Sequence, residues 1–390
     1  MEHKKTVLFI ESGVHGGGSF TSLKKHILAL DLKRIEPIVA FFNQNNYIKE
    51  FEDMGIQVFL IKDTVFSVDG GSKQAKLFNK FYMKGLLPFF KIKLLLYLHR
   101  KAIQELSDIL SQYKVRFIHC NTELFRDRVG ILLSMKTGVP IISHIRSKYE
   151  PGRIKFDPTY VKLSNQIVSK FIFVSEDTRT FWVNEVGLGE EKSLVLYDYF
   201  ILPKPSENTA LQKDASFSLL CVASLVEVKG HYFLIDSLRD TLLKYSAKLF
   251  LVGGGDENYT NELKAYCKDK GLTEKVVFLG FRSDVPSLIA SADIIYLLSK
   301  REGMPNILIE ALGMGATVVG SKVGGIPEII YDKETGFLVE YGDQEEIGRI
   351  TKSILENEID TQQINENARR LVEKKFSLAS YKQTIENLYE

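Results

Sequence analysis

Short runs of apolar residues that end in polar residues alternate along the chain with stretches whose apolar residues recur every three or four positions. The first pattern indicates buried parallel strands, and the second indicates amphipathic helices. The predicted strands are Thr6–Glu11, Pro37–Phe42, Gln57–Ile61, Phe117–Asn121, Ile141–Arg146, Phe171–Ser175, Ser193–Tyr197, Leu219–Ser224, Lys248–Val252, Val276–Phe281 and Asp293–Ser299. The same strand–helix rhythm runs on both sides of the polar, proline-containing segment 203–208, which predicts two α/β domains with parallel sheets.

The length agrees with this division, because 390 residues are too many for one hydrophobic core. We predict a first domain over residues 1–202, a second over 203–375 and a terminal helix over 376–390. The three cysteines, Cys120, Cys221 and Cys267, are far apart and form no C-x-x-C motif. They are typical of reduced thiols in a cytosolic protein rather than of a disulfide framework or a metal site.

No secretion signal is recognised, because the apolar run Val7–Ile10 is too short for one. Lys91 and Lys93 interrupt the longest apolar region, which therefore does not predict a membrane span. We expect a cytoplasmic protein.

The stretch from Ser299 to Glu328 carries the strongest chemical signal, since it places Glu302 and Glu310 with seven residues between them. Pro305 suits the first turn of a helix, so Glu302 is predicted in the loop before that helix and Glu310 in its second turn. Loops at the carboxyl ends of parallel strands are where α/β sheets bind ligands.

A phosphate could bind the N–H groups of Met304, Asn306 and Ile307 at the start of this helix. The two carboxylates could then accept hydrogen bonds from sugar hydroxyls. Proline itself has no N–H and contributes only the turn. The simpler interpretation of either glutamate alone is a partner for the helix dipole.

The E-x7-E pattern, followed by ATVVGSKVGGIPE, resembles the retaining glycosyltransferases of family 4, and the resemblance extends over essentially the whole chain. It implies the α/β fold class with two Rossmann-like domains facing across a cleft, the B-type glycosyltransferase fold. The terminal helix is then expected to cross back to the first domain. The first domain would bind the acceptor and the second the nucleotide sugar.

The same resemblance implies roles for individual residues. Glu310 would hold the ribose hydroxyls, Glu302 the donor sugar, and Lys229 the diphosphate, while His144 would position sugar or acceptor. The further donor-binding positions are Gly17 and Gly18 in the first glycine-rich loop, Ser224, Arg282, and Met304, Pro305, Asn306 and Ile307. Ser224 departs from the family pattern, which has an arginine there, so Arg146 or Arg301 is expected to supply the missing cation. His119 is expected to be structural.

Together with these features, the resemblance implies a retaining glycosyltransferase that moves a hexose or N-acetylhexosamine from a nucleotide-diphosphate sugar, in the first instance a UDP-sugar. The acceptor would be a glycan or a lipid-linked molecule of bacterial surface-polysaccharide synthesis. No cofactor or metal is expected, because cations and helix N–H groups would stabilise the leaving diphosphate. The alternatives are a nucleotide-sugar-binding protein without turnover and a transferase acting on a small soluble acceptor; a nucleotide-sugar epimerase has less support.

Residues 70–104 contain no Asp or Glu but eight Lys or Arg interleaved with aromatic and aliphatic residues. Lys80, Lys84, Lys91 and Lys93 belong to this segment. The composition suits a helix lying on an anionic membrane surface, which would make the protein peripheral on the inner face of the cell membrane. It also suits a helix that packs on the first sheet. Nucleic acid is not an expected partner, because no binding module accompanies the basic residues.

Overall fold

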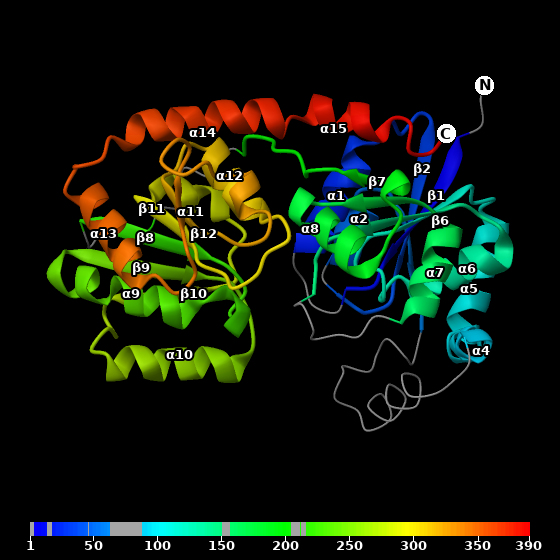
Figure 1. The fold of residues 1–390 in the computed structure, drawn as a ribbon, viewed down its shortest axis with the longest axis horizontal. Helices are drawn as coiled ribbons and strands as arrows, with labels where there is room; N and C mark the ends of the chain where they lie inside the picture. Colours follow the sequence, from blue (N-terminus) through cyan, green and yellow to red (C-terminus); the bar gives the residue numbers. More distant parts are fainter. Residues whose placement is uncertain are drawn as a thin grey trace. The chain divides into compact units, whose positions relative to one another are not determined.

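The computed structural model describes residues 4–13, 18–45, 47–62, 88–149, 157–203, 211 and 216–390. The chain divides into two compact units (Figure 1). Unit 1 comprises the residues up to Asp198 together with Tyr381–Glu390, and unit 2 comprises Tyr199–Ser380. The sequence-based division ended the first domain at residue 202, whereas unit 1 ends at Asp198. It began the terminal helix at residue 376, whereas the chain returns to unit 1 at Tyr381.

Unit 1 is built on a parallel sheet whose described strands have the order β3-β2-β1-β4-β5-β6-β7. The strands are β1 (Lys5–Glu11), β2 (Ile35–Phe41), β3 (Gln57–Leu60), β4 (Phe117–Cys120), β5 (Ile141–Ile145), β6 (Val168–Phe173) and β7 (Ser193–Val195). From β1 the chain builds β2 and β3 on one side and returns to build β4 and its successors on the other. The carboxyl ends of β1 and β4 therefore flank the point where the strand order reverses, which is where open α/β sheets bind ligands.

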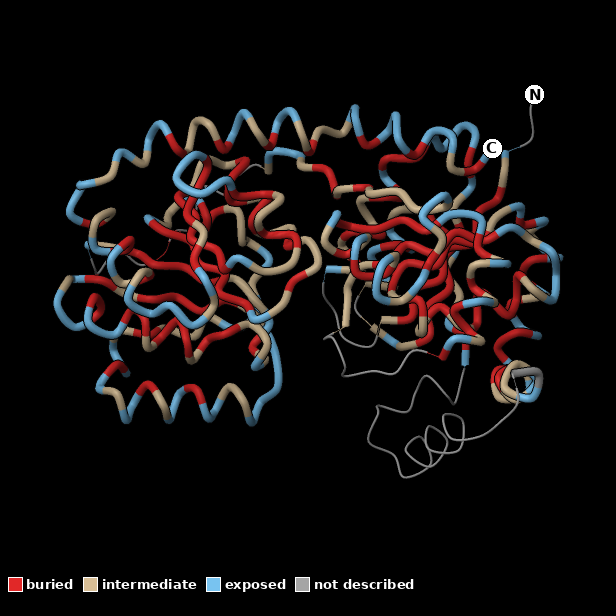
Figure 2. The backbone as a smooth tube through the Cα atoms, in the orientation of Figure 1, coloured by how far each residue is buried: buried red, intermediate tan, exposed pale blue. Residues whose placement is uncertain are grey.

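The helices of unit 1 cover this sheet and leave its central strands almost inaccessible to solvent (Figure 2). They are α1 (Gly18–Ala29), α2 (Tyr47–Asp53), α4 (Pro88–Leu98), α5 (Arg100–Gln112), α6 (Arg128–Thr137), α7 (Pro158–Ile167), α8 (Glu176–Thr180), the π-helix η1 (Phe181–Val186) and the 3-10 helix η2 (Glu190–Lys192). Leu8, Ile118 and Phe171 are fully buried in one core with Leu106 of α5 and Leu132 of α6. Apolar strands enclosed in this way explain why the strand signal in the sequence was strong.

Unit 2 has a second parallel sheet, with the described strands in the order β10-β9-β8-β11-β12-β13. Its strands are β8 (Phe217–Val222), β9 (Ala247–Val252), β10 (Val276–Gly280), β11 (Ile294–Leu297), β12 (Val318–Ser321) and β13 (Phe337–Val339). The order reverses between β8 and β11, so the loops after these two strands flank the corresponding ligand-binding position. Each strand predicted from the sequence overlaps an observed strand, whereas β12 and β13 were not predicted.

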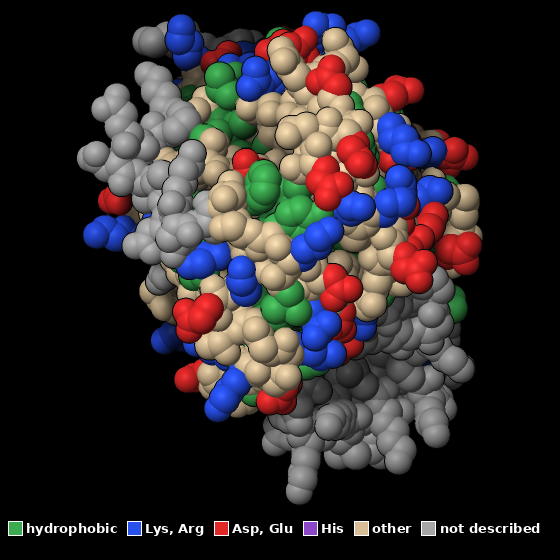
Figure 3. Space-filling model, turned by 90° about the vertical axis from the view of Figure 1, so that its left-hand side faces the viewer, with side chains coloured by type: hydrophobic (Ala, Val, Ile, Leu, Met, Phe, Trp, Pro, Cys, Tyr) green, Lys and Arg blue, Asp and Glu red, His purple; other side chains and the backbone are tan. Residues whose placement is uncertain are grey.

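The helices of unit 2 are α9 (His231–Lys244), α10 (Glu257–Asp269), α11 (Val285–Ser291), α12 (Asn306–Gly313), α13 (Gln344–Leu355) and α14 (Thr361–Lys375), with the 3-10 helices η3 (Glu227–Lys229) and η4 (Ile326–Glu328). The last helix, α15 (Leu378–Ile385), continues into the part of the chain that belongs to unit 1. Acidic and basic side chains are interspersed on the face shown in Figure 3. The two units together confirm the predicted α/β fold class with two Rossmann-like domains.

Candidate functional site

Two loops of unit 2 meet at the position where its strand order reverses. One follows β8 and contains Lys229, and the other follows β11 and contains Glu302. The Lys300 N–H donates to the Val228 carbonyl oxygen at 2.8 Å, which joins the loops through their backbones. Lys229 Nζ lies 2.6 Å from Glu302 Oε1, which is an ion pair at hydrogen-bond distance. The structure therefore brings together two residues that are 73 positions apart in the sequence.

The Glu302 carboxylate is held firmly in this pair. Ser299 Oγ donates to the same Glu302 oxygen at 2.5 Å, and Ser321 Oγ donates to the Ser299 carbonyl oxygen at 2.7 Å. The Glu302 side chain is 8% exposed and that of Lys229 is 24% exposed, so the lysine is the member that a ligand reaches more easily.

Two glycines allow the loops to approach so closely. Gly230 has φ +70, and a Cβ built on it would lie 2.0 Å from the Leu298 carbonyl oxygen. Gly324 has φ +56, and a Cβ there would lie 2.0 Å from the Glu302 carbonyl oxygen. Both positions combine a left-handed backbone with contact to another backbone segment, and only glycine satisfies both conditions.

Helix α12 places the remaining residues of the predicted donor site. Glu302 lies in the loop before it and Glu310 in its second turn, as the sequence predicted. Pro305 is the residue that precedes the helix, with φ −78 and ψ 104, rather than a member of its first turn. The N–H groups of Met304, Asn306 and Ile307, which were predicted to bind phosphate, lie at or just before the N-terminus of α12.

Four other residues were predicted to bind the donor: Ser224, Arg282, Gly17 and Gly18. Ser224 is exposed in the loop after β8. The Arg282 guanidinium forms two hydrogen bonds with Asp284, at 2.7 and 2.5 Å, which occupy its polar edge. Gly18 begins α1 in unit 1, and Gly17 lies outside the described residues.

His144 lies on β5 of unit 1 with its side chain fully buried. Its ring centroid is 5.5 Å from that of His119 and 6.1 Å from that of His26, and neither of its ring nitrogens has a hydrogen-bond partner among the described residues. Burial, followed by the charge of Arg146 and the neighbouring histidines, holds its pKa well below the usual 6.5. The imidazole is therefore neutral at pH 7, so it cannot act there as a cationic proton donor.

His119 is part of the same buried cluster. Its Nδ1 is 2.7 Å from the Tyr389 hydroxyl, which is also 2.7 Å from His26 Nε2, and His26 Nδ1 is 2.7 Å from the Tyr381 hydroxyl. The histidines thus attach the C-terminal segment of the chain to the interior of unit 1.

Arg146, one of the two residues considered as the replacement for the missing arginine, is held inside unit 1. Its Nε and Nη2 donate to Asn121 Oδ1 at 3.1 and 2.7 Å, and its Nη1 donates to Asp198 Oδ1 at 3.0 Å. Asn121 Nδ2 in turn donates to Glu11 Oε2 at 2.6 Å. Glu11 is fully buried at the end of β1, and burial raises its pKa to about 7 despite these hydrogen bonds.

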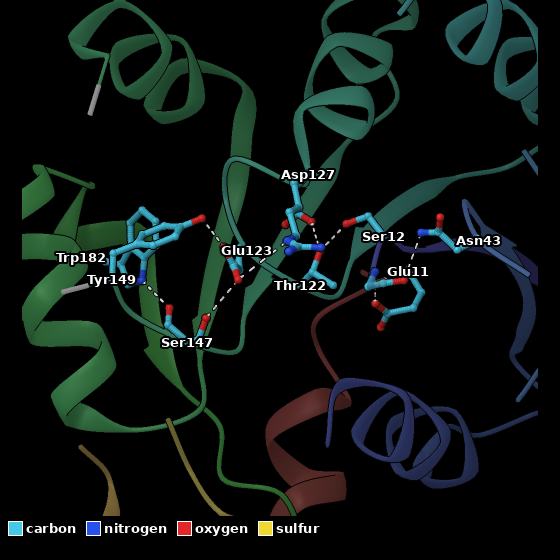
Figure 4. Close-up of polar contacts among 11 residues, drawn as sticks. Glu11, Ser12, Asn43, Thr122, Glu123, Asp127, Ser147, Tyr149 and Trp182 are labelled. Carbon is cyan, nitrogen blue, oxygen red and sulfur yellow. Dashed lines mark hydrogen bonds and ion pairs between the residues drawn. The ribbon is translucent and has the colours of Figure 1, made fainter. Parts of the chain in front are cut away.

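A second buried carboxyl group lies beside this network. Thr122 Oγ1 and Ser143 Oγ donate to the two oxygens of Asp127, at 2.8 and 2.9 Å. Ser12 Oγ lies 2.6 Å from Thr122 Oγ1, which connects the loop after β1 to that after β4 (Figure 4). Burial raises the pKa of Asp127 to about 8.

Glu123 was not identified from the sequence. Figure 4 shows the Tyr149 hydroxyl and Ser147 directed at its carboxylate, to which both donate hydrogen bonds, the latter at 3.3 Å. Trp182 Nε1 donates to the Ser147 carbonyl oxygen at 2.9 Å and fixes that loop. A detectable signal was present, because polar Asn121, Thr122 and Glu123 directly follow a buried strand.

Helix α4 and the first residues of α5 contain the described part of the basic segment. Lys91 Nζ is 3.3 Å from Asp157 Oδ1, and both side chains are largely buried, so this lysine faces the interior. Lys93 is exposed, as are Phe90 and Tyr97 on the same helix. Lys80 and Lys84 lie outside the described residues. Within the described part of the chain, no helix is long and apolar enough to cross a membrane, and no three His, Cys, Asp or Glu side chains are grouped to hold a metal ion.

Comparison with known proteins identifies relatives of this architecture. Residues 206–371 match the family model described as glycosyl transferases group 1. N-acetyl-alpha-D-glucosaminyl L-malate synthase of Bacillus anthracis is 30% identical over 186 residues, which are 46% of this chain and 48% of that enzyme. The match thus spans about half the length of the Bacillus enzyme.

Two further similarities extend over most of the chain. The N,N'-diacetylbacillosaminyl-diphospho-undecaprenol alpha-1,3-N-acetylgalactosaminyltransferase of Campylobacter jejuni is 25% identical over 366 residues, 88% of each chain. The crystal structure of Anabaena HepE in complex with UDP-glucose superposes with a TM-score of 0.77 at 21% identity, over 98% of each chain. At this identity, the similarity to HepE shows a shared fold.

Proposed function

The C-terminal unit of this chain belongs to the glycosyl transferases of group 1, and from this premise we propose that the protein is a retaining glycosyltransferase that uses a UDP-sugar. The observation that carries the proposal is the Lys229–Glu302 pair, which lies where the strand order of unit 2 reverses and next to the start of α12. A cation, a carboxylate and a helix N-terminus in one place suit a molecule that has both phosphate and hydroxyl groups.

In this proposal the residues of unit 2 bind and activate the donor. Lys229 and the N–H groups at the start of α12 stabilise the negative charge that develops on the departing diphosphate, which is usually the largest contribution to catalysis in such a site. Glu310 accepts hydrogen bonds from the ribose hydroxyls and Glu302 from the donor sugar. The acceptor hydroxyl attacks from the side of the leaving group, whose phosphate oxygen takes its proton, so the anomeric configuration is retained.

Different similarities support the UDP donor and the acceptor class. The solved structure of HepE holds UDP-glucose on the same fold, which supports a UDP-sugar donor. The name of the Campylobacter relative gives a lipid-linked sugar as its acceptor, which supports a glycan or lipid-linked acceptor of surface-polysaccharide synthesis here. A small acceptor is the second candidate, because the name of the Bacillus relative contains malate.

A membrane-associated location accompanies a lipid-linked acceptor. Exposed Lys93 and the 52% and 62% exposed side chains of Phe90 and Tyr97 support contact between α4 and an anionic lipid surface. Lys91 is excluded from this contact by its pairing with Asp157.

Thermal-shift screening against UDP- and GDP-sugars tests the donor assignment. A ligand present at a hundred times its dissociation constant adds about 2.7 kcal/mol to the free energy of unfolding. We expect a rise in melting temperature with UDP and UDP-sugars that is reduced in a Lys229→Ala variant. A rise with every nucleotide that is unchanged in this variant contradicts the proposed site, and turnover measurements then separate an enzyme from a protein that only binds the nucleotide sugar.

A further inference from the structure

A cavity of about 270 Å³ opens at the carboxyl ends of β1, β4 and β5 in unit 1. Its lining includes Gly13, Thr122, Glu123, Arg126, Arg146 and Ser147. These residues flank the reversal of strand order in unit 1, where a ligand site is expected. The volume is slightly below the range of about 300–1,000 Å³ for drug-sized ligands, which suits one ring-sized group rather than a whole nucleotide.

Arg146 presents fixed hydrogen-bond donors to this cavity. The bonds to Asn121 and Asp198 use three of its N–H groups. A guanidinium has five, so two N–H groups have no partner in the described part of the chain. The Arg146 side chain is 8% exposed, and because its orientation is already determined, a ligand that accepts these hydrogen bonds loses little side-chain freedom.

Glu123 presents a fixed acceptor to the same cavity. The Tyr149 hydroxyl and Ser147 Oγ hold its carboxylate, whose two oxygens offer about four acceptor positions. Arg126 Nε is 3.9 Å from Glu123 Oε1, which is beyond hydrogen-bond distance, so this arginine does not saturate the carboxylate.

The charges around the cavity decide which ligand these groups suit. Arg126 and Arg146 contribute two positive charges, and Glu123 together with Asp198, the partner of Arg146, contributes two negative charges. Glu11 and Asp127 accept hydrogen bonds from the lining residues Gly13 and Thr122, and as buried carboxyl groups they can add only negative charge. Among the described residues, the cavity therefore has no excess positive charge for a carboxylate or phosphate ligand. It instead offers a donor and an acceptor, the combination that sugar hydroxyls match because each hydroxyl both donates and accepts.

We propose that this cavity binds an uncharged sugar ring of the acceptor, with neighbouring hydroxyls held between Arg146 and Glu123. The inference rests on the proposed function and deepens it. It favours a sugar acceptor, as in the name of the Campylobacter relative, over a carboxylic acid such as the malate in the name of the Bacillus relative.

The Glu123→Gln variant separates these acceptors by the sign of its effect. The amide keeps the shape: its oxygen can accept from one of the two hydroxyls of Tyr149 and Ser147, and its NH2 group can donate to the other. Saturation-transfer NMR with the full chain and UDP would measure the binding of methyl α-glucoside, methyl α-N-acetylglucosaminide and L-malate. Loss of a hydrogen bond to a charged group should weaken binding of at least one glycoside about tenfold or more. An anion should instead bind more tightly, because a repelling charge has been removed.

Two control variants make the result specific. Glu105→Gln changes an exposed glutamate of α5 and should bind as the wild type does. Arg126→Gln removes a positive charge that lines the cavity and should weaken the binding of an anion such as L-malate more than that of a glycoside, because the sugar hydroxyls are held by Arg146 and Glu123.

Malate binding that strengthens in Glu123→Gln overturns the assignment, as does a wild-type protein that binds UDP but neither glycoside. Unchanged glycoside binding in Glu123→Gln also overturns it. Loss of UDP binding to wild-type protein contradicts the proposed function instead, so the two failures are distinguishable.

Discussion

Lys229 Nζ lies 2.6 Å from Glu302 Oε1, so a donor diphosphate that binds Lys229 has to share this cation with a carboxylate of the protein itself. Ser299 donates a hydrogen bond to the same Glu302 oxygen. If the carboxylate turned away from Lys229, it would lose this second hydrogen bond as well. Substrate affinity and catalysis therefore make opposing demands on Glu302. It weakens the attraction of Lys229 for phosphate, yet it is the carboxylate assigned to the donor sugar.

The Glu302→Gln substitution should separate these two effects. Removal of the competing charge should increase UDP affinity by about two- to tenfold, the equivalent of one hydrogen bond of about 0.5–1.5 kcal/mol. Turnover of UDP-sugar should fall at least as far as affinity rises, because the carboxylate no longer faces the sugar. Isothermal titration with UDP and an assay of UDP release measure the two quantities. Weaker UDP binding in the variant would show that Glu302 contributes to nucleotide binding rather than opposing it.

Glu310→Gln should have the opposite effect on the nucleotide. Hydrogen bonds to a charged acceptor are worth about 1.5–3 kcal/mol, so UDP affinity should fall about ten- to a hundredfold while the melting temperature without UDP stays near that of the wild type. Glu345→Gln on the exposed side of α13 is a suitable control. Unchanged affinity would remove Glu310 from the ribose role.

Arg301 and Arg146 differ in their ability to compensate for Ser224. Arg146 is bound to Asn121 and Asp198 inside unit 1, and its loss would leave the Asp198 carboxylate buried without its cation. Arg146→Ala should therefore lower the melting temperature. Arg301 lies in the loop after β11, immediately before Glu302, and Arg301→Ala should reduce turnover at least as much as Lys229→Ala without a comparable loss of stability. Normal turnover in Arg301→Ala would mean that Lys229 and the start of α12 are sufficient.

The buried histidines predict that acid destabilises the protein. The pKa of His26 is lowered to about 3, and those of His119 and His144 lie well below 6.5, in each case mainly because of burial. The unfolded chain binds protons at these sites below pH 6.5 and the folded chain does not. Stability is therefore complete above pH 6.5 and is lost as the pH falls towards the folded-state pKa values.

In the His119→Asn variant the free energy of unfolding should fall less steeply as the pH is lowered, because one proton fewer is taken up on unfolding. The difference in slope should approach about 1.4 kcal/mol per pH unit between pH 6 and 4. Urea unfolding at several pH values measures it. The same slope in both proteins would contradict the assignment of His119 as a neutral buried group. The raised pKa values of Glu11 and Asp127 act in the opposite direction in both proteins and cancel in the comparison.

Binding to anionic lipid should depend on the exposed basic residues of α4 and of the first turn of α5. The triple substitution of Lys93, Arg100 and Lys101 by Glu should weaken salt-sensitive sedimentation with vesicles that contain anionic lipid, since each basic residue near the surface contributes about 1 kcal/mol. All three residues are exposed. Lys91→Glu is unsuitable as a test because it would place a carboxylate against buried Asp157. Wild-type protein that ignores such vesicles at low salt would favour an acceptor that is not membrane-bound.

Much of the fold could be predicted from the sequence because the strands are short apolar runs with polar ends. The strands β12 and β13 were missed because glycines lie beside or within them, at Gly315, Gly320 and Gly336, and read as turns; length is not the reason, since the three-residue strand β7 was predicted. Pro305 precedes α12 by one residue, a difference within the usual uncertainty of helix ends.

The two candidate sites differ in how far sequence reasoning reached them. Glu302 and Glu310 lie on one short segment with a recognisable spacing, so the donor site was accessible. The cavity in unit 1 combines Gly13, Glu123 and Arg146 from three strand ends, and their proximity depends on the order of the strands. Lys91 was assigned to a lipid-facing surface because the composition of segment 70–104 suited one. Its ion-pair partner, Asp157, is distant in the sequence, so the pairing that turns Lys91 inward could not be predicted.

Product analysis of a transfer reaction tests the central claim most directly. The full chain would be incubated with UDP-glucose, UDP-galactose, UDP-N-acetylglucosamine or UDP-N-acetylgalactosamine, with and without a glycoside acceptor, and followed by proton NMR. We predict release of UDP from at least one donor and a product in which the transferred sugar keeps the α configuration of the donor. Lys229→Ala should reduce both signals. A product of β configuration would contradict retention, and a protein that binds UDP-sugars but releases no UDP from any of them under these conditions would contradict the proposed enzyme.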